Sequence, residues 1–433
     1  MRIAVIGSGI AGNSAAWALC DRHEVVLYEK RLRPGGHSAT VDIDYDGVPI
    51  AVDTGFIVYN ELNYPNLTAL FAHLGVRTEA SDMSFALSVD GGAREWAGTS
   101  LDTIFAQRRN LASPRFLWML REILRFNRQC IADRAAGLLA PLSLGEYLAL
   151  RRFSRAFVDD YLVPMGAAIW STPASEMFAF PAESFVAFFE NHRLVHADRP
   201  VWRTVSGGSR TYVQRLLDPL KGQIRLGTPV TAIRRESGQV RVRDASGNED
   251  AFDHAILASH TDQTLAMLAD PSEDEARLLS AIRYRPNEVY LHRDPALMPK
   301  RRRVWSSWNY MARSDAAAGT DVSVSYWMNR LQNIDPARPL FVSLNPAEPP
   351  RPELTFARFT YDHLQFDTAA LAAQRQIGTI QGRRNTWYCG AWCGHGFHED
   401  GLASGLAVAR AFGAVLPWDI GAEGPVPVAE AAE

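Results

Sequence analysis

The sequence is poor in lysine. Its 433 residues include only Lys30, Lys221 and Lys300, so arginine supplies almost all of the positive charge. The 45 basic and 48 acidic residues leave a formal net charge of −3. Proteins that bind nucleic acids usually carry a basic excess, and the balanced charge therefore argues against a nucleic-acid partner.

Cysteine is also scarce. The four cysteines are scattered along the chain, and no pair of them completes a zinc-ligand pattern with histidines. So low a number excludes a disulfide scaffold, which is typical of short secreted chains. We expect free thiols, no metal ion and a cytoplasmic protein.

Long apolar runs are missing as well. No stretch reaches the roughly 20 apolar residues that a membrane-spanning helix needs. The first residues enter a strand at once, without the apolar segment of a cleavable signal. A chain of this length exceeds one ordinary hydrophobic core, which predicts two domains.

Glycine, in contrast, stands at informative positions. Gly7, Gly9 and Gly12 form a G-x-G-x-x-G pattern between an apolar strand at 3–6 and a small-residue helix at 13–19. The first glycine allows a tight turn, the second lets the backbone approach a pyrophosphate, and the third lets the helix pack closely on the strand. The alternative is a glycine turn in an unrelated α/β protein.

The neighbours of this pattern favour a dinucleotide. Ile10 and Ala11 stand where the helix begins, and the free N–H groups of a helix N-terminus attract phosphate. Glu29, followed by Lys30, ends the next strand at 25–28. A carboxylate at this position accepts hydrogen bonds from ribose hydroxyls and would repel a 2′-phosphate.

A second glycine-rich segment comes directly afterwards. Arg33, Gly35, Gly36 and His37 open an R-x-G-G-x-x-x-T pattern. Two glycines let the backbone pass close to a cofactor, and the arginine can face a diphosphate. The alternative is a Pro-Gly surface turn.

Three further segments follow in the middle and at the end of the chain. They are Thr54, Gly55 and Phe56 in a D-x-G context, Val230 at the start of a strand-like stretch, and Gly390, Gly401 and Leu402 in a block that reads as a strand end, a loop and a glycine-rich helix start.

Together these segments resemble the FAD motifs of the amine oxidase, phytoene desaturase and protoporphyrinogen oxidase superfamily, in the superfamily's order. The resemblance implies non-covalent FAD, with Val230 meeting the adenine and the helix at Gly401 donating N–H groups to the flavin's pyrimidine oxygen. Two residues depart from the superfamily's pattern. His37 stands where Arg or Lys is usual, and Trp392 stands where an acidic residue is frequent.

The resemblance also implies an α/β architecture. We expect a Rossmann-type FAD-binding domain of three ββα layers with an inserted α+β substrate domain. The expected limits are 1–60, 200–265 and 380–420 for the FAD-binding domain, 61–199 and 266–379 for the substrate domain, and 421–433 for a disordered tail.

The substrate site is expected to be apolar. Trp170, Trp308 and Tyr326 are candidates to line it, although each could equally be a core residue. Amine oxidases of the superfamily commonly place a lysine near flavin N5. Lys300 lies in a basic turn and is a poor candidate for that role, and His292 is the candidate for that position.

Acid–base work is assigned to histidines, which titrate near neutral pH. Besides His292, the candidates are His395 and His398, and a structural role is an open alternative for all three. Residues 108–128 combine arginines with apolar and aromatic side chains. This pattern predicts either peripheral contact with the inner membrane or a core helix with a solvated arginine face.

The leading hypothesis is an FAD-dependent oxidoreductase that takes a hydride from a hydrophobic substrate, such as a lipid-linked fatty acyl chain. Segments 164–171, 207–209 and 396–401 resemble a bacterial subgroup associated with fatty-acyl modification. An amine oxidase and a flavin-dependent isomerase are the enzyme alternatives. A flavin-bound sensor and an NAD dehydrogenase fit the motifs less well. The electron acceptor is left open.

Overall fold

Five short apolar segments from distant parts of the chain form one parallel sheet. The computed structural model describes residues 1–170, 173–196, 200–315 and 319–419. The strands are β1 (Arg2–Ile6), β2 (Glu24–Tyr28), β10 (Ile224–Arg225), β14 (His254–Leu257) and β20 (Thr386–Tyr388), in the order β10-β2-β1-β14-β20. The strands predicted at 3–6 and 25–28 are confirmed.

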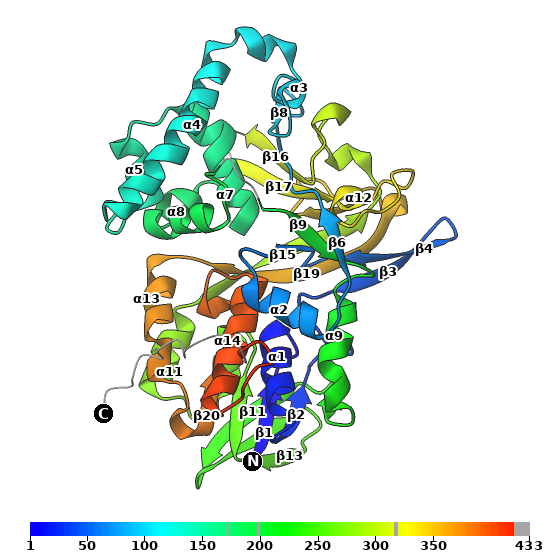
Figure 1. Cartoon of the computed structure of the whole chain (residues 1–433), viewed down its shortest axis with the longest axis vertical. Helices are drawn as coiled ribbons and strands as arrows, with labels where there is room; N and C mark the ends of the chain where they lie inside the picture. Colours follow the sequence, from blue (N-terminus) through cyan, green and yellow to red (C-terminus); the bar gives the residue numbers. More distant parts are fainter. Residues whose placement is uncertain (171–172, 197–199, 316–318, 420–433) are drawn as a thin grey trace.

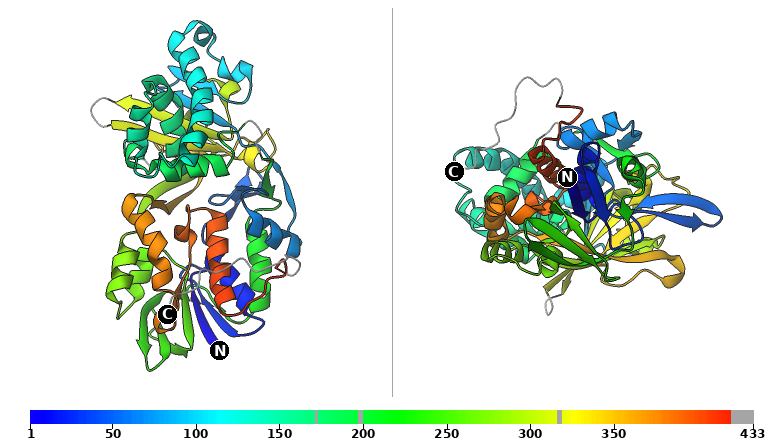
Figure 2. Two further views of the ribbon diagram at one scale, coloured as in Figure 1. Left: turned by 60° about the vertical axis from the view of Figure 1, so that its left-hand side comes forward. Right: turned by 90° about the horizontal axis from the view of Figure 1, so that it is seen from below.

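Alternate residues of β1 face two different cores. Ile3 and Val5 pack against a helical layer, and Ala4 and Ile6 pack against a second sheet. The helical layer is α1 (Ile10–Leu19), α9 (Arg210–Leu217) and α14 (His398–Ala411), and the second sheet is β11 (Val230–Glu236), β12 (Gln239–Asp244) and β13 (Glu249–Phe252). The predicted ββα layering is therefore confirmed (Figure 2).

A seven-stranded mixed sheet forms the other half of the molecule (Figure 1). Its order is β19-β15-β18-β17-β16-β7-β8. The strands are β7 (Phe85–Val89), β8 (Arg94–Ala97), β15 (Arg283–His292), β16 (Trp308–Asp315), β17 (Gly319–Trp327), β18 (Phe341–Leu344) and β19 (Thr355–Gln365).

Helices cover one face of this sheet. Tyr310 and Val324 of the sheet share a core with Phe126, Phe157 and Phe185 of the helical layer. The helices are α3 (Leu101–Ile104), α4 (Pro114–Ala135), α5 (Leu144–Leu150), α6 (Arg155–Phe157), α7 (Val163–Trp170) and α8 (Ala182–Asn191).

Small sheets and helices connect the two halves. The hairpin β3 (Thr40–Tyr45) and β4 (Val48–Asp53) lies at the junction, as does the sheet of β5 (Val58–Asn60), β9 (Trp202–Val205) and β6 (Thr78–Ser81). The other described α-helices are α2 (Pro65–His73), α10 (Thr261–Met267), α11 (Glu273–Ser280), α12 (Met328–Leu331) and α13 (Thr368–Gln376).

The segment predicted as one amphipathic helix at 108–128 is interrupted. A short 3-10 helix η1 (Arg108–Ala112) precedes α4, which runs from Pro114 to Ala135. Proline favours the first turn of a helix, and the Ser113 side chain caps that turn by accepting from the Phe116 N–H. The predicted tail at 421–433 lies outside the described residues. Among the described helices, none has the length and apolar character to cross a bilayer.

The crossing of α1 and α14 depends on a residue without a side chain. A Cβ on Gly405 would lie 2.2 Å from the Ala11 carbonyl oxygen and 2.4 Å from Ser14 Oγ. Gly405→Ala should therefore force the helices apart and cost about 1–3 kcal/mol of unfolding free energy, measured by thermal or urea unfolding. Gly378→Ala is the matched control, because a Cβ there meets nothing within 4 Å. Equal stability of the two variants would contradict this packing account.

Candidate cofactor and substrate site

The first glycine loop is tight on one side and open on the other. Gly7 has a positive φ of 106°, and a Cβ on Gly12 would lie 1.9 Å from the Gly7 carbonyl oxygen. A Cβ on Gly9 would meet nothing within 4 Å. Ile10 and Ala11 form the start of α1, where the first N–H groups have no intrahelical partner. The open side at Gly9 is therefore lined by free N–H groups.

Glu29 is held next to this loop. Its Oε2 accepts from the Ser8 N–H at 3.0 Å and from Ser8 Oγ at 2.5 Å, and its Oε1 accepts from the Arg31 N–H at 2.8 Å. The carboxylate is buried and its pairing fixes it at the end of β2. Lys30 turns away, because its Nζ donates to Gln263 at the surface.

The second glycine-rich segment lies against the first. A Cβ on Gly36 would come within 2.9 Å of the Gly9 Cα, and the Gly35 N–H donates to the Ser8 carbonyl at 2.9 Å. Arg33 is half-buried and donates to the Gly36 carbonyl at 3.1 Å, so it braces its own loop. Burial lowers the pKa of Arg33.

His37 forms a partly buried histidine group with His260 and His363. Its ring centroid lies 6.4 Å from that of His260, 6.1 Å from that of His363 and 5.2 Å from that of Tyr361. Burial, followed by the neighbouring imidazoles, lowers the pKa of His37 to about 3. Its Nε2 and His260 Nδ1 are buried polar atoms that have no hydrogen-bond partner within the described residues. Such atoms require a partner, and a bound ligand would supply one.

The D-x-G segment joins the two halves of the molecule. Thr54 Oγ1 lies 2.8 Å from the Tyr361 hydroxyl of β19, and the Phe56 N–H donates to the His37 carbonyl at 2.8 Å. A Cβ on Gly55 would collide with that same carbonyl oxygen at 2.2 Å. Thr54, Gly55 and Phe56 therefore bring backbone directly beside His37.

His398 stands at the start of α14 and faces this segment. Its ring stacks on Phe56 with centroids 3.9 Å apart, and its Nε2 lies 2.6 Å from the Tyr212 hydroxyl. That hydroxyl in turn forms a short hydrogen bond with Ser38 Oγ. Burial lowers the pKa of His398 to about 3, so its ring is neutral at pH 7. The histidine is thus oriented within a chain of hydroxyl groups.

The C-terminal block closes the site. Gly401 and Leu402 are buried, and a Cβ on Gly401 would lie 2.8 Å from Ile10 Cγ2. Because α14 begins at His398, the Gly401 N–H already donates to the Phe397 carbonyl at 3.1 Å. The N–H groups left for a ligand at this helix start belong to residues 398–400.

Trp392 fills the place where an acidic residue was expected from the superfamily's pattern. It is buried, and its Nε1 donates to the Ser259 carbonyl at 3.2 Å. A Cβ on Gly390 would lie 2.3 Å from that nitrogen. Gly390 therefore gives room to the indole, and Trp392 ties the C-terminal loop to the end of β14.

Within the described residues, no hydrogen bond or ring contact joins either of the other two histidine candidates to His398. His292 is fully buried in the mixed sheet, where Nε2 bonds Ser343 Oγ at 2.8 Å and Nδ1 accepts from the Asp294 N–H at 3.1 Å. Burial lowers the pKa of His292 to about 4. His395 is half-buried, with its ring 6.4 Å from Phe188. Both ring nitrogens of His292 are thus used in structure.

The aromatic candidates divide into two groups. Trp170 lies in the helical core among four phenylalanines. Trp308 and Tyr326 meet edge to face at 5.0 Å, and both pack against the helical core and against the junction cluster that contains Ile57. This pair is half-buried at the boundary between the two halves.

Asp53 and His260 were not among the site residues predicted from the sequence, although Asp53 is the aspartate of the D-x-G segment. Asp53 is buried and accepts from the Ser209 N–H at 2.9 Å, from Thr40 Oγ1 at 2.6 Å and from Gln332 Nε2 at 3.1 Å. Burial raises its pKa in spite of these donors. His260 follows β14, and its place at the carboxyl end of a parallel strand was the one feature that could have indicated a site residue.

Val230, at the start of β11, follows Thr228, whose N–H donates to the Glu29 carbonyl at 2.9 Å.

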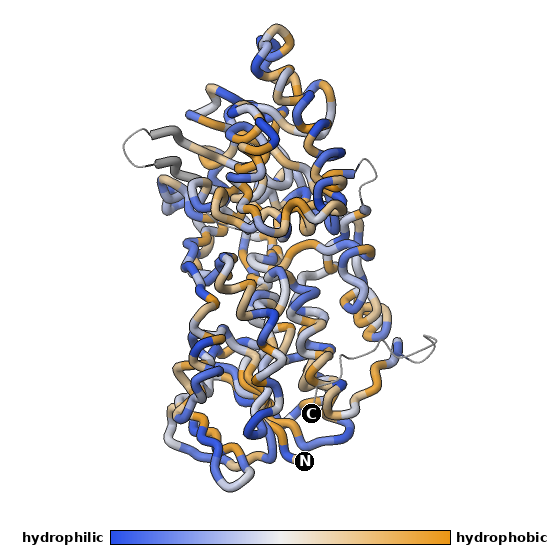
Figure 3. The backbone as a smooth tube through the Cα atoms, turned by 90° about the vertical axis from the view of Figure 1, so that its left-hand side faces the viewer, coloured by the Kyte–Doolittle hydropathy of each residue, from blue (hydrophilic) through white to orange (hydrophobic). Residues whose placement is uncertain are grey.

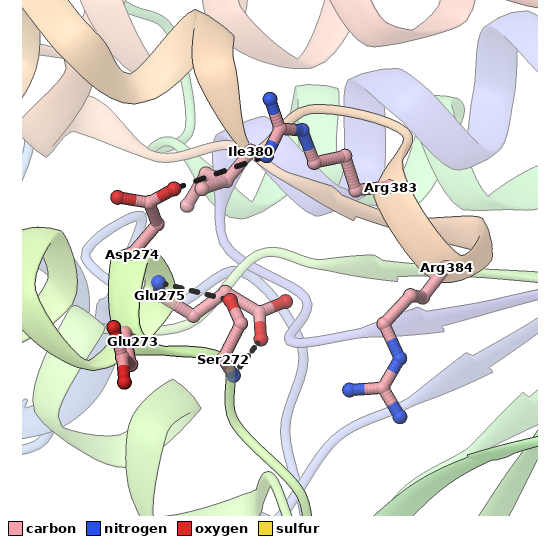
Figure 4. A pocket seen from close by; sticks show the side chains of 7 residues that line it. All are labelled: Ser272, Glu273, Asp274, Glu275, Ile380, Arg383 and Arg384. Atoms are coloured by element: carbon pink, nitrogen blue, oxygen red, sulfur yellow. Dashed lines mark hydrogen bonds and ion pairs between the residues drawn. The ribbon is translucent and has the colours of Figure 1, made fainter.

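A separate surface cavity of about 420 Å³ shares no residue with this site (Figure 4). It lies between α11 and the loop at 380–384. Glu275, one of its lining residues, bonds Arg235 at 2.7 Å and the Tyr388 hydroxyl at 2.5 Å. These paired groups make it a structural ion-pair network, and we assign it no ligand.

The residues present fit FAD. The loops at the carboxyl ends of the parallel strands carry the groups that a dinucleotide needs. These groups are the open side of Gly9, the carboxylate of Glu29 and the unpartnered nitrogens of His37 and His260. Open α/β sheets bind dinucleotides at that edge. Cys389 is fully buried, and burial raises its pKa, so it offers no nucleophile for covalent attachment.

Gly9 provides a direct test of this site. Gly9→Val places a side chain in the open space, because φ is −67° there and no atom lies within 4 Å of a Cβ. The apoprotein should melt within a few degrees of the wild type, whereas FAD affinity, measured by flavin fluorescence titration, should fall at least about a hundredfold. Unchanged FAD affinity would place the cofactor elsewhere.

Comparison with known proteins agrees with this geometry. The model of the family described as flavin containing amine oxidoreductase matches residues 10–330. No curated protein matches the chain. Among solved structures, a double mutant of putrescine oxidase is 16% identical with a TM-score of 0.68, covering 96% of this chain and 100% of that one.

Two other solved structures share the fold. A CLA-producing fatty acid isomerase from P. acnes is 16% identical with a TM-score of 0.67, covering 95% of this chain and 98% of that one. Cyclohexylamine oxidase from Brevibacterium oxydans IH-35A is 15% identical with a TM-score of 0.63 and the same coverage of 95% and 98%. The chain belongs to the family of flavin containing amine oxidoreductases and is an FAD-dependent oxidoreductase.

Proposed function

We propose that this oxidoreductase oxidises a hydrophobic substrate, a fatty acyl chain of a lipid, rather than an amine. The observation that carries the proposal is the Trp308–Tyr326 pair, which packs against the same core cluster as Ile57 at the junction of the two halves. Ile57 follows Phe56, on which His398 stacks. An apolar chain would find aromatic and aliphatic surfaces on the substrate side of this junction.

The distribution of lysine supports this choice. Lys30, Lys221 and Lys300 are all exposed at the surface. In amine oxidases of the superfamily a lysine commonly acts near flavin N5, and none of these three is placed for that role. Glu399, a carboxylate at the start of α14, is already bonded to the N–H groups of Asn66 and Leu67.

The cofactor and the residues of the site have separate roles in the proposed oxidation. FAD, when bound, accepts a hydride at its N5 atom. The neighbouring carbon of the acyl chain must then lose a proton, and His398 is our candidate for the base. Burial lowers its pKa, so the ring is neutral with a lone pair at pH 7 and is a weak base that would hold the proton only transiently. Tyr212 and Ser38 hold the ring in place through Nε2.

Loops exclude water from this centre. Phe56 covers one face of the His398 ring, and Phe397 stacks on Phe188 with centroids 4.8 Å apart. The loop at 33–40 lies against the first glycine loop through Gly36, and Trp392 ties the loop at 390–396 to Ser259, after β14. A dry centre favours hydride transfer and prevents loss of protons to solvent.

A fatty acid isomerase with this fold makes flavin-dependent isomerisation a second candidate. Isomerisation would use the same acyl site but consume no electron acceptor. We also propose that segment 108–128 contacts the membrane from which such a lipid would come. In α4 and η1, Leu111, Leu117, Trp118 and Leu124 are 44–64% exposed.

Anaerobic titration of the FAD-loaded enzyme distinguishes the candidates. Detergent-dispersed phosphatidylglycerol with unsaturated acyl chains should bleach the flavin absorption, and putrescine should not. Trp308→Ala should weaken the lipid effect about tenfold or more, and Trp308→Phe should restore most of it, because the ring supplies the contact. Bleaching by putrescine alone would establish an amine oxidase. A changed lipid without bleaching would establish an isomerase.

A further inference from the structure

Two basic segments that are far apart in sequence meet at the helical end of the molecule. Arg108 donates to Asp102 at 2.5 Å, and Arg303 lies 3.9 Å from the same carboxylate. Arg301 bonds Glu95 of β8 at 2.7 Å, and the Lys300 N–H donates to the same side chain at 2.7 Å. The segments 108–115 and 300–303 therefore form one surface with β8.

Positive charge exceeds negative charge on this surface, which we call the basic face. Its eight basic side chains are Arg94, Arg108, Arg109, Arg115, Lys300, Arg301, Arg302 and Arg303. The five carboxylates next to them are Asp90, Glu95, Asp102, Asp159 and Asp160. The whole chain has a net charge of −3, so the surplus here is local.

The basic face contains a cavity of about 240 Å³. Arg94, Arg109 and Arg115 line it, and Trp96 and Phe116 are among its apolar walls. Arg94 and Arg115 share the carboxylate of Asp160, at 2.6 and 2.9 Å. Arg109 donates to the Ala93 carbonyl, and no carboxylate pairs with it within the described residues. The cavity is lined by these three guanidinium groups and by two carboxylates, Glu95 and Asp160, so its lining carries one surplus positive charge for a further anion.

Exposed apolar side chains surround the same end. Leu101 is 75% exposed, Leu111 is 54% exposed and Trp118 is 48% exposed. Arg121 lies over the Trp118 ring at 4.8 Å, so the indole is presented beside a positive charge. Apolar and polar stretches of chain alternate at this end (Figure 3). Aromatic and aliphatic side chains rimmed by arginine are typical of surfaces that enter a bilayer interface.

We propose that the basic face docks on an anionic phospholipid bilayer, with a lipid phosphate in the cavity of Arg94, Arg109 and Arg115 and with Leu101, Leu111 and Trp118 in the acyl region. This inference rests on the membrane contact proposed above and does not depend on the redox chemistry. It adds the headgroup charge and the segment 300–303. Guanidinium groups bind phosphate through paired N–H donors, and each basic residue near an anionic surface strengthens binding.

Vesicle sedimentation of the FAD-loaded full chain tests the proposal. Vesicles of phosphatidylcholine that contain phosphatidylglycerol should bind the protein at low salt, and added salt should weaken that binding because it screens the charges. Pure phosphatidylcholine vesicles should bind much less. Arg109→Glu with Arg302→Glu should weaken binding about tenfold or more. Both side chains are exposed, so folding should be preserved.

Matched controls are available in the other half of the molecule. Arg241→Glu with Arg277→Glu makes the same change of charge at side chains 47% and 54% exposed, and should leave binding unchanged. Leu111→Ser with Trp118→Ser should also weaken binding, whereas Val415→Ser, at a residue 64% exposed, should not.

Equal binding to both kinds of vesicle, or equal loss in the Arg241 and Arg277 control, would overturn the proposal. Binding to a DNA oligonucleotide but not to vesicles would overturn it too. Vesicle binding without flavin bleaching by dispersed lipid would leave the docking intact and contradict oxidation of the acyl chain. Bleaching by dispersed lipid without vesicle binding would contradict the docking alone.

Discussion

The contact between the first glycine loop and its neighbours is the constraint on which the arrangement depends. A Cβ on Gly12 would lie 1.9 Å from the Gly7 carbonyl oxygen, and a Cβ on Gly405 would lie 2.2 Å from the Ala11 carbonyl oxygen. Any side chain at these positions would separate α1 from β1 or from α14. Because α1 packs closely on both β1 and α14, residues near the two ends of the chain lie together in one site. Gly9 is exempt from this crowding, and the space above it is what a diphosphate requires.

The sequence predicted the nucleotide-binding half well. The spacing of Gly7, Gly9 and Gly12 and the carboxylate of Glu29 have a local cause, so a short window reveals them. The ββα layering and the cofactor follow from the order of the motifs. The pairing of strands that are far apart in the chain has no such local pattern in the sequence. Strand β7 pairs with β16, more than 200 residues away, and β8 pairs with the other edge of β7, yet no motif in the sequence marked either strand.

The substrate side could be predicted only in outline. His398 and Phe56 come from separate motifs, and only the fold stacks their rings. His260 and His363 join His37 through β14 and β19, without any shared pattern in the sequence. His292 is the opposite example. Sequence made it a plausible base, but inside the sheet both of its ring nitrogens are hydrogen-bonded, one to Ser343 and one to the Asp294 N–H. Residue type suggests the chemistry, but burial and partners decide whether a side chain is free to perform it.

The central claim is that the loops around Gly9 hold FAD without a covalent bond. Visible absorption of the purified protein, read before and after acid precipitation, tests it most directly. The account predicts the two broad bands of an oxidised flavin at about 370 and 450 nm, one FAD per chain, and release of all the colour into the acid supernatant. A colourless protein that does not take up added FAD would contradict the claim, and colour retained in the pellet would contradict its non-covalent part.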